Sequence, residues 1–92
     1  MLTKPQFILY SRYNCHLCED MLEIIQSLQH SATGDVLFEL LIIDVDKNPL
    51  DKEKYGLKIP ILFFVNNKQL QEVCQYYFDQ KTFLEYVYSN KH

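Results

Sequence analysis

Three features of the sequence predict one α/β domain with the element order β-α-β-α-β-β-α. Its 92 residues suffice for a single domain with a single core, spanning residues 1–92. Short apolar runs that suit strands, at residues 7–10, 36–43 and 61–65, alternate with segments of helical periodicity. A turn signal at residues 66–68 joins the third strand to a fourth. We therefore expect a four-stranded mixed sheet flanked by helices on both faces.

The first strand is expected at residues 7–10, and a helix follows the polar loop at residues 12–14. Asn14 is the expected helix cap, because its side chain can accept a hydrogen bond from a first-turn N–H group. Cys15 would then be the first helical residue. Apolar residues at helical spacing define the expected buried face, and these are Leu17, Met21, Ile24, Ile25 and Leu28. The turn-rich residues 31–35 end this helix.

The middle of the chain predicts a second strand and a short helix. Residues 36–43 are almost continuously apolar, which is typical of a strand buried on both faces of a parallel sheet. Asn48 and Pro49 then suit the cap and the first position of a helix. That helix would close at Tyr55, with Gly56 as its left-handed terminator.

A hairpin and a last helix complete the prediction. The third and fourth strands are expected at residues 61–65 and 69–75, joined by a turn in which Asn tolerates positive φ. Asp79 is the expected cap of the last helix. The buried side of that helix would be supplied by Phe83, Leu84, Val87 and several tyrosines. The helical crossover between the first two strands predicts that they are parallel.

Composition and charge argue against two classes of protein. Acidic residues outnumber basic residues by 12 to 9, whereas proteins that bind nucleic acids usually carry a basic surplus. No apolar run reaches the roughly 18 residues that a membrane span needs. Residues 1–6 also lack the pattern of a signal peptide. We therefore expect a cytoplasmic protein with no nucleic-acid partner and no membrane partner.

Cys15 and Cys18 carry the clearest chemical signal, because they lie where the first helix should begin. A thiol at a helix N-terminus meets unpaired N–H groups and the positive end of the helix dipole. Both favour the thiolate, which attacks disulfides and binds metals. Two cysteines three residues apart on a helix can also reach each other. Redox chemistry, metal binding and a chance pair all stay open, and redox chemistry is favoured because four zinc ligands are not evident.

The element order, the Cys-x-x-Cys motif and Ile59-Pro60 ahead of the third strand together resemble the thioredoxin fold across essentially the whole chain. Within that fold, residues 10–19 are similar to small glutaredoxin-like proteins with a Cys-x-Leu-Cys motif. The resemblance implies a thiol–disulfide oxidoreductase. Cys15 would attack the substrate and Cys18 would resolve the mixed disulfide, leaving a Cys15–Cys18 disulfide.

The resemblance also implies a substrate-binding segment. It implies that the peptide bond before Pro60 is cis and that the backbone of Ile59 pairs with an extended substrate as an added strand. Tyr13 could contact a partner or shield the thiolate, and is as readily a surface residue. His16 is expected to be solvated, and Leu17 to be the first core residue of its helix.

The sequence departs from glutathione-using glutaredoxins after the fourth strand. Those proteins carry a Gly-Gly pair there, whereas residues 74–79 contain no glycine. The lysine often found ahead of their motif is missing, although Arg12 is nearby. We expect no bound metal or cofactor, and glutathione stays open as a reductant. Cys74 is expected to be packing material, and Tyr76, Tyr77 and Phe78 are expected to pack between helix and sheet.

The expected partner is a protein disulfide or a small-molecule disulfide, and the chain is expected to be monomeric. Two other functions stay open beside the oxidoreductase. One is a protein-binding module whose cysteine pair is non-catalytic or sensory. The other is an iron–sulfur or metal carrier that uses Cys15, as a dimer.

Overall fold

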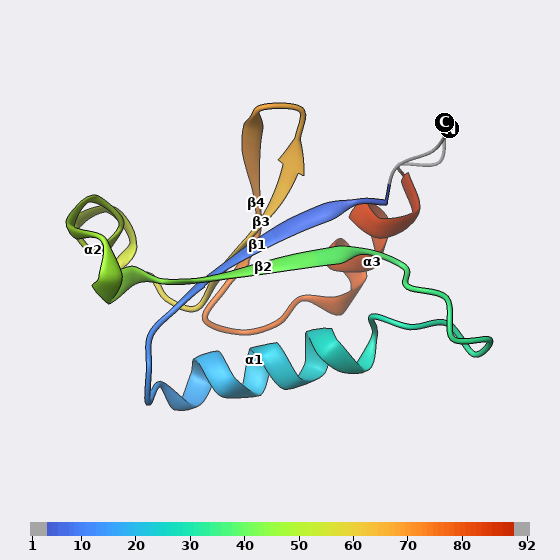
Figure 1. The fold of residues 1–92 in the computed structure, drawn as a ribbon, viewed down its shortest axis with the longest axis horizontal. Helices are drawn as coiled ribbons and strands as arrows, with labels where there is room; N and C mark the ends of the chain where they lie inside the picture. Colours follow the sequence, from blue (N-terminus) through green and yellow to red (C-terminus); the bar gives the residue numbers. More distant parts are fainter. Residues whose placement is uncertain (1–3, 90–92) are drawn as a thin grey trace.

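The computed structural model describes residues 4–89 and confirms the predicted α/β class (Figure 1). The elements in chain order are β1 (Gln6–Ser11), α1 (His16–Ser27), β2 (Glu39–Asp44), the 3₁₀ turn η1 (Val45–Lys47), α2 (Pro49–Tyr55), β3 (Ile61–Asn66), β4 (Gln69–Gln75) and α3 (Gln80–Ser89). No helix within the described range is long and apolar enough to cross a membrane. Residues 1–3, on which the signal-peptide expectation partly depends, lie outside that range.

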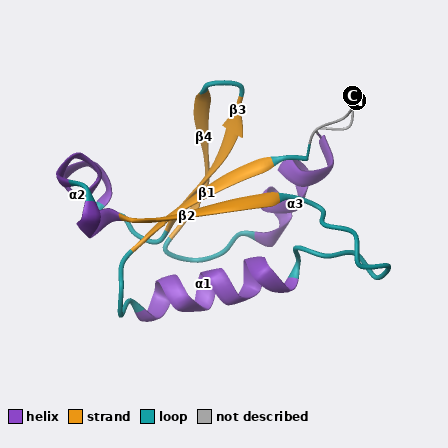
Figure 2. Cartoon of the chain, viewed as in Figure 1, coloured by secondary structure: helices purple, strands orange, loops and turns teal. Residues whose placement is uncertain are grey.

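The four strands form one mixed sheet in the order β2-β1-β3-β4 (Figure 2). β1 pairs with β2 in parallel, as the helical crossover predicted, and with β3 antiparallel. β3 and β4 form the predicted antiparallel hairpin, in which Asn67 adopts a φ of 59°. This topology brings the last residues of β1, β2 and β4 and the first residues of β3 to the same end of the sheet. The candidate site is formed by the segments after β1, β2 and β4 and by the segment before β3.

The two faces of the sheet carry separate apolar clusters. On one face, α1 and α3 cover a large cluster (Figure 1), whose fully buried members include Phe7, Leu9, Ile25, Leu62 and Phe83. On the other face, α2 covers a smaller cluster formed by Tyr10, Val45, Tyr55, Ile61 and Phe63. Each fully buried side chain of this size contributes about 1.5–3 kcal/mol. The second cluster lies at the end of the sheet where the candidate site is formed.

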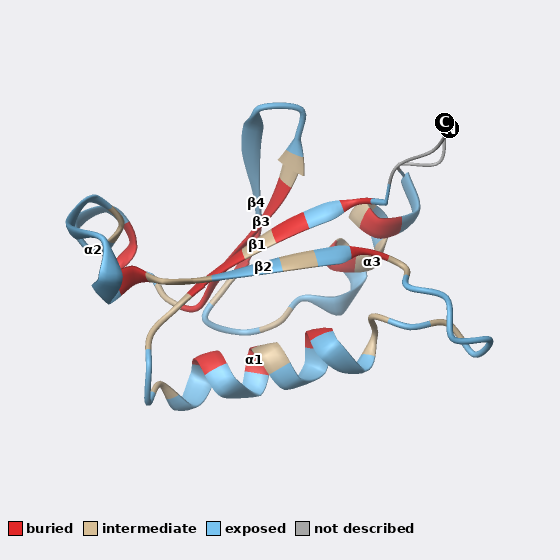
Figure 3. Ribbon diagram, in the orientation of Figure 1, coloured by how far each residue is buried: buried red, intermediate tan, exposed pale blue. Residues whose placement is uncertain are grey.

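The expectation that the second strand is buried on both faces was wrong. β2 is an edge strand with no buried residue along its length (Figure 3). Its Leu41 and Ile42 are 56% and 45% exposed. Phe38, directly before β2, is the fully buried member of the apolar run. An apolar run indicates a strand, but the position of that strand in the sheet depends on pairing with distant segments.

The buried face of α1 also differs from the prediction. Cys18, Met21 and Ile25 are buried, whereas Leu17 and Ile24 are 36% and 41% exposed. Leu17 is therefore not the first core residue of the helix. Apolar residues lie on two neighbouring faces of this helix, so the sequence pattern is compatible with either face being buried. Packing of the helix against the sheet buries the face that carries Cys18.

The two shorter helices begin where their cap signals predicted. Asn48 and Asp79 each accept a hydrogen bond from a first-turn N–H group, at 2.9 Å and 3.1 Å. Gly56, however, is not the left-handed terminator of α2, since its φ is −57°. A Cβ atom at Gly56 would collide with the carbonyl of Lys52, so close packing explains this glycine.

Candidate redox site

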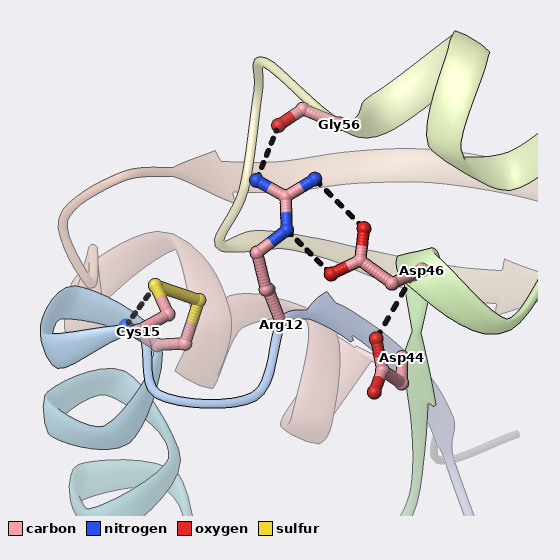
Figure 4. Close-up of polar contacts among 6 residues, drawn as sticks. Arg12, Cys15, Asp44, Asp46 and Gly56 are labelled. Carbon is pink, nitrogen blue, oxygen red and sulfur yellow. Dashed lines mark hydrogen bonds and ion pairs between the residues drawn. A yellow bond between two sulfur atoms is a disulfide. The ribbon is translucent and has the colours of Figure 1, made fainter.

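Cys15 and Cys18 are joined by a disulfide where β1 leads into α1 (Figure 4). Their Cα atoms lie 5.2 Å apart, within the usual range for disulfides. Cys18 is only 3% exposed, whereas Cys15 is half-buried. The sulfur of Cys15 is therefore the one that a second molecule can approach more easily.

Cys15, and not Asn14, is the cap of α1. Its Sγ accepts a hydrogen bond from the backbone N–H of Cys18 at 3.2 Å, and its own backbone is extended. Asn14 instead adopts a φ of 61°, a left-handed conformation that Asn tolerates better than most residues, and so turns the chain into the helix. The prediction followed the general preference for Asn at caps. Because a first-turn N–H points at the sulfur of Cys15, the local geometry favours a thiolate there.

Arg12 connects the loop before the cysteines to two distant segments (Figure 4). Its Nε and Nη2 donate to the two carboxylate oxygens of Asp46, at 2.8 Å and 3.1 Å. Its Nη1 donates to the carbonyl of Gly56 at 3.4 Å. The hydrogen bond from Arg12 holds the pKa of Asp46 below its usual value and raises the pKa of Arg12. Sequence reasoning noted Arg12 only as a neighbour of a missing lysine, and no local signal pointed to Asp46.

Ile59 and Pro60 lie directly before β3, and the peptide bond between them is cis. Pro60 is buried, and Ile59 is half-buried against the smaller apolar cluster. The carbonyl of Pro60 accepts a hydrogen bond from the backbone N–H of Tyr76 at 2.7 Å. This bond ties the segment before β3 to the chain after β4. The pairing of Ile59 with a substrate stays a prediction.

Tyr76 lies in the region where glutathione-using glutaredoxins carry glycines. It adopts a φ of 67°, which is uncommon for a bulky residue, and its hydroxyl donates to the carbonyl of Leu57 at 2.7 Å. Tyr76 and Tyr77 are 40% and 72% exposed, so the expectation that both pack between helix and sheet was wrong. Phe78 does pack there, with its ring centroid 5.2 Å from that of Phe83.

The remaining predicted residues are placed as follows. Tyr13 is 86% exposed, so its ring is available to a partner and packs little against the disulfide. His16 is solvated as predicted, with its Nε2 3.6 Å from a carboxylate oxygen of Asp20. Cys74 is buried in the larger apolar cluster as predicted, and burial raises the pKa of its thiol. Among residues 4–89, no group of three or more His, Cys, Asp and Glu side chains is placed to hold a metal ion.

Residues 6–87 match the family model described as glutaredoxin-like domain (DUF836). The solution NMR structure of protein Ne2328 from Nitrosomonas europaea is 31% identical, with a TM-score of 0.73 over 94% of each chain. The X-ray structure of protein XcR50 from X. campestris is 22% identical, with a TM-score of 0.62 over 90% of this chain and 96% of that one. A malarial protein of 15% identity has a TM-score of 0.65 over 98% of this chain and 100% of that one. No curated protein matches this sequence.

Proposed function

Because this chain belongs to the glutaredoxin-like domain family and has a thioredoxin-like fold, we propose that it is a thiol–disulfide oxidoreductase. Cys15 and Cys18 would cycle between a dithiol and a disulfide. The observation that carries the proposal is the environment of Cys15. Cys15 is the more accessible of the two cysteines and the N-cap residue of α1, and its sulfur accepts a hydrogen bond from the backbone N–H of Cys18 at 3.2 Å. A hydrogen-bond donor and a helix N-terminus stabilise the thiolate that the reaction requires.

The reaction has two exchange steps. The thiolate of Cys15 attacks one sulfur of a substrate disulfide, forms a mixed disulfide and releases the other substrate sulfur as a thiolate. Cys18, once deprotonated, then attacks the sulfur of Cys15 and releases the second substrate thiolate. The substrate gains two electrons and the cysteine pair loses two. An external thiol or dithiol reductant must return two electrons before the next cycle.

A trapping experiment tests this assignment. In a Cys18→Ser variant the second step is impossible, so we expect a stable mixed disulfide on Cys15 when the reduced protein meets 2-hydroxyethyl disulfide. Mass spectrometry of the intact protein and of its peptides locates the adduct. The matched control is a Cys15→Ser variant, which should form no comparable adduct through Cys18 or Cys74. If Cys15 reacts with iodoacetamide no faster than Cys74 at neutral pH, the proposal is wrong.

The other parts of the proposal concern setting and partners. We propose a monomer in the cytoplasm that acts on protein or small-molecule disulfides and holds no resident cofactor. The odd number of cysteines, three, supports a reducing compartment, because a secreted disulfide framework usually uses an even number. Light scattering of the purified protein tests the monomer, and cell fractionation tests the compartment.

A further inference from the structure

The charge of Arg12 is already matched within the protein. Asp46 receives two hydrogen bonds from the guanidinium in a bidentate arrangement, which is the strongest geometry for this pair. Asp46 is itself held in place, because its backbone N–H donates to a carboxylate oxygen of Asp44 at 2.9 Å. Arg12 also donates to the carbonyl of Gly56, so three of its donor groups point into the chain (Figure 4). A ligand carboxylate that approaches this cation therefore meets a charge that Asp46 already balances.

A second basic side chain, between the two cysteines, also lies close to a carboxylate. His16, the second basic side chain between residues 11 and 20, has its Nε2 3.6 Å from Asp20. Glu19 adds another carboxylate in the first turn of α1. The loop and the first turn therefore offer no surplus of positive charge to a substrate. Asp46 adds one carboxylate to them, and the exposed Lys58 beside Leu57 adds one cation.

Neutral side chains are exposed next to these matched charges. Tyr13 follows Arg12 and is 86% exposed, and Leu57 follows Gly56 and is 92% exposed. The hydrogen bond from Arg12 to Gly56 brings the two segments that carry these side chains together. An exposed aromatic ring and an exposed aliphatic side chain suit an uncharged polypeptide better than a small anion.

We propose that Asp46 is a specificity-determining residue that, by pairing with Arg12, makes the site favour neutral or cationic disulfides over anionic ones. This inference rests on the proposed oxidoreductase function. The substrate class is then a disulfide in an uncharged or basic polypeptide segment. Glutathione disulfide, which carries several carboxylates, belongs to the disfavoured class. Removing the charge of Asp46 would leave the guanidinium of Arg12, three residues before Cys15, with only the weaker attraction of Asp44, and so attract anionic disulfides more strongly.

Three small disulfides of similar size but different charge serve as probes: cystamine (cationic), 2-hydroxyethyl disulfide (neutral) and dithiodipropionate (anionic). A Cys18→Ser/Cys74→Ser background stops the reaction at the mixed disulfide on Cys15. The measured quantity is the ratio of the anionic rate to the neutral rate within each variant, which cancels differences in the reactivity of Cys15. In the background protein this ratio should be below one. Asp46→Asn should raise it about fivefold at low salt, and the rise should vanish at high salt.

Two matched variants identify the cause of any change. Adding Arg12→Gln to Asp46→Asn removes the released cation, so the ratio should return to its original value. Glu39→Gln changes the net charge equally but lies where β2 begins, at the opposite end of that strand from Asp44, and should leave the ratio unchanged.

The outcomes separate this inference from the proposed function. If Asp46→Asn leaves the ratio unchanged while 2-hydroxyethyl disulfide still reacts at Cys15, the specificity role of Asp46 is wrong and the oxidoreductase proposal stands. An equal rise in the Glu39→Gln variant also overturns that role, because the effect would then be one of net charge. If Cys15 reacts with none of the three probes, the proposed function fails and this inference fails with it. Glutathione disulfide, tested last, should follow the anionic probe in every variant.

Discussion

Replacing Cys74 with alanine should lower stability moderately at neutral pH and remove a loss of stability at alkaline pH. Cys74 lies opposite Leu62 in the β3–β4 pairing and is 8% exposed within the larger apolar cluster. Burial is the largest cause of the raised pKa of its thiol, relative to an ordinary value of 9.0. A hydrogen bond from the backbone of Asp79 opposes that shift, and the charges of Asp79 and Glu72 add to it.

The neutral-pH effect follows from two losses. Removing a buried sulfur forfeits roughly the burial of one methylene group, about 0.8 kcal/mol. It also leaves a small cavity, whose cost adds to the lost burial because the surrounding side chains relax only partially. The Cys74→Ala variant should therefore unfold with a free energy about 1–2 kcal/mol below that of its parent.

The alkaline effect has a definite sign. The thiol of Cys74 has a higher pKa in the native protein than in the unfolded chain, so the unfolded chain ionises first as pH rises. The resulting stability is fully present below the unfolded pKa and is lost as pH rises through the native pKa. The slope is at most about 1.4 kcal/mol per pH unit. Above about pH 9 the stability difference between the parent and the Cys74→Ala variant should therefore shrink. Tyr10, whose pKa burial also raises, is present in both proteins and cancels.

Urea unfolding at about pH 7 and at several values between about pH 9 and pH 10.5 measures this difference. Both proteins carry Cys15→Ser and Cys18→Ser, so that thiol exchange cannot occur in the unfolded chain. A stability difference that stays constant across this range would refute the account of Cys74 as a buried, protonated thiol. A Cys74→Ala variant with the other cysteines intact should reduce 2-hydroxyethyl disulfide at the parent rate. A severalfold lower rate would show instead that Cys74 takes part in turnover.

Three further substitutions test the caps and the close packing beside the site. Asn48→Ala should lower the free energy of unfolding by about 1 kcal/mol in urea, because α2 loses its cap. Gly56→Ala should destabilise by about 1–3 kcal/mol in the same assay, since its Cβ would meet the carbonyl of Lys52, and any stabilisation would contradict the packing argument. Hydrogen bonds from Thr82 lower the pKa of Asp79, so this carboxylate stabilises the protein above its unfolded pKa near 3.8, and the effect is lost as pH falls through the native pKa. Thermal unfolding between about pH 2 and pH 6 should show a shallower acid dependence for Asp79→Ala, and an unchanged one would remove Asp79 from the acid transition.

Signals that act within a few residues predicted most of the fold. The turn at Asn67, the cap at Asn48 and the cap at Asp79 each follow from the conformational preference of one or two residues. The parallel pairing of β1 and β2 follows from the helix between them. The observed bounds of β4, Gln69–Gln75, equal the predicted bounds, because the turn and the strand length together determine the hairpin.

The errors concern relations between distant segments. The apolar run at residues 36–43 could not show that β2 would be an edge strand, because the strand order depends on β3 and β4. Leu17 and Ile24 fit a helical stripe as well as Cys18 does, and only contact with the sheet decides between the stripes. Local preference also failed at Asn14, whose left-handed backbone leaves the cap of α1 to Cys15.

The candidate site also contains residues that local signals predicted and residues that they did not predict. Cys15, Cys18 and Pro60 were found because they stand in recognisable positions of the chain. The partners Arg12 and Asp46 are 34 residues apart, and nothing near either residue predicts the pair. The electrostatic character of the site, which depends on that pair, therefore required the structure.

Tyr76 shows why the missing glycines after β4 do not imply a missing site. Its backbone takes the left-handed conformation that glycine adopts readily, and its N–H and hydroxyl hold the carbonyls of Pro60 and Leu57, each at 2.7 Å. Arg12 also donates a hydrogen bond to the carbonyl of Gly56. The segment that leads to Pro60 is thus fixed at three carbonyls by residues from two separate loops. A predicted substrate-binding segment that is ordered before a substrate arrives needs less ordering on binding, so less of the binding free energy is spent on fixing its backbone.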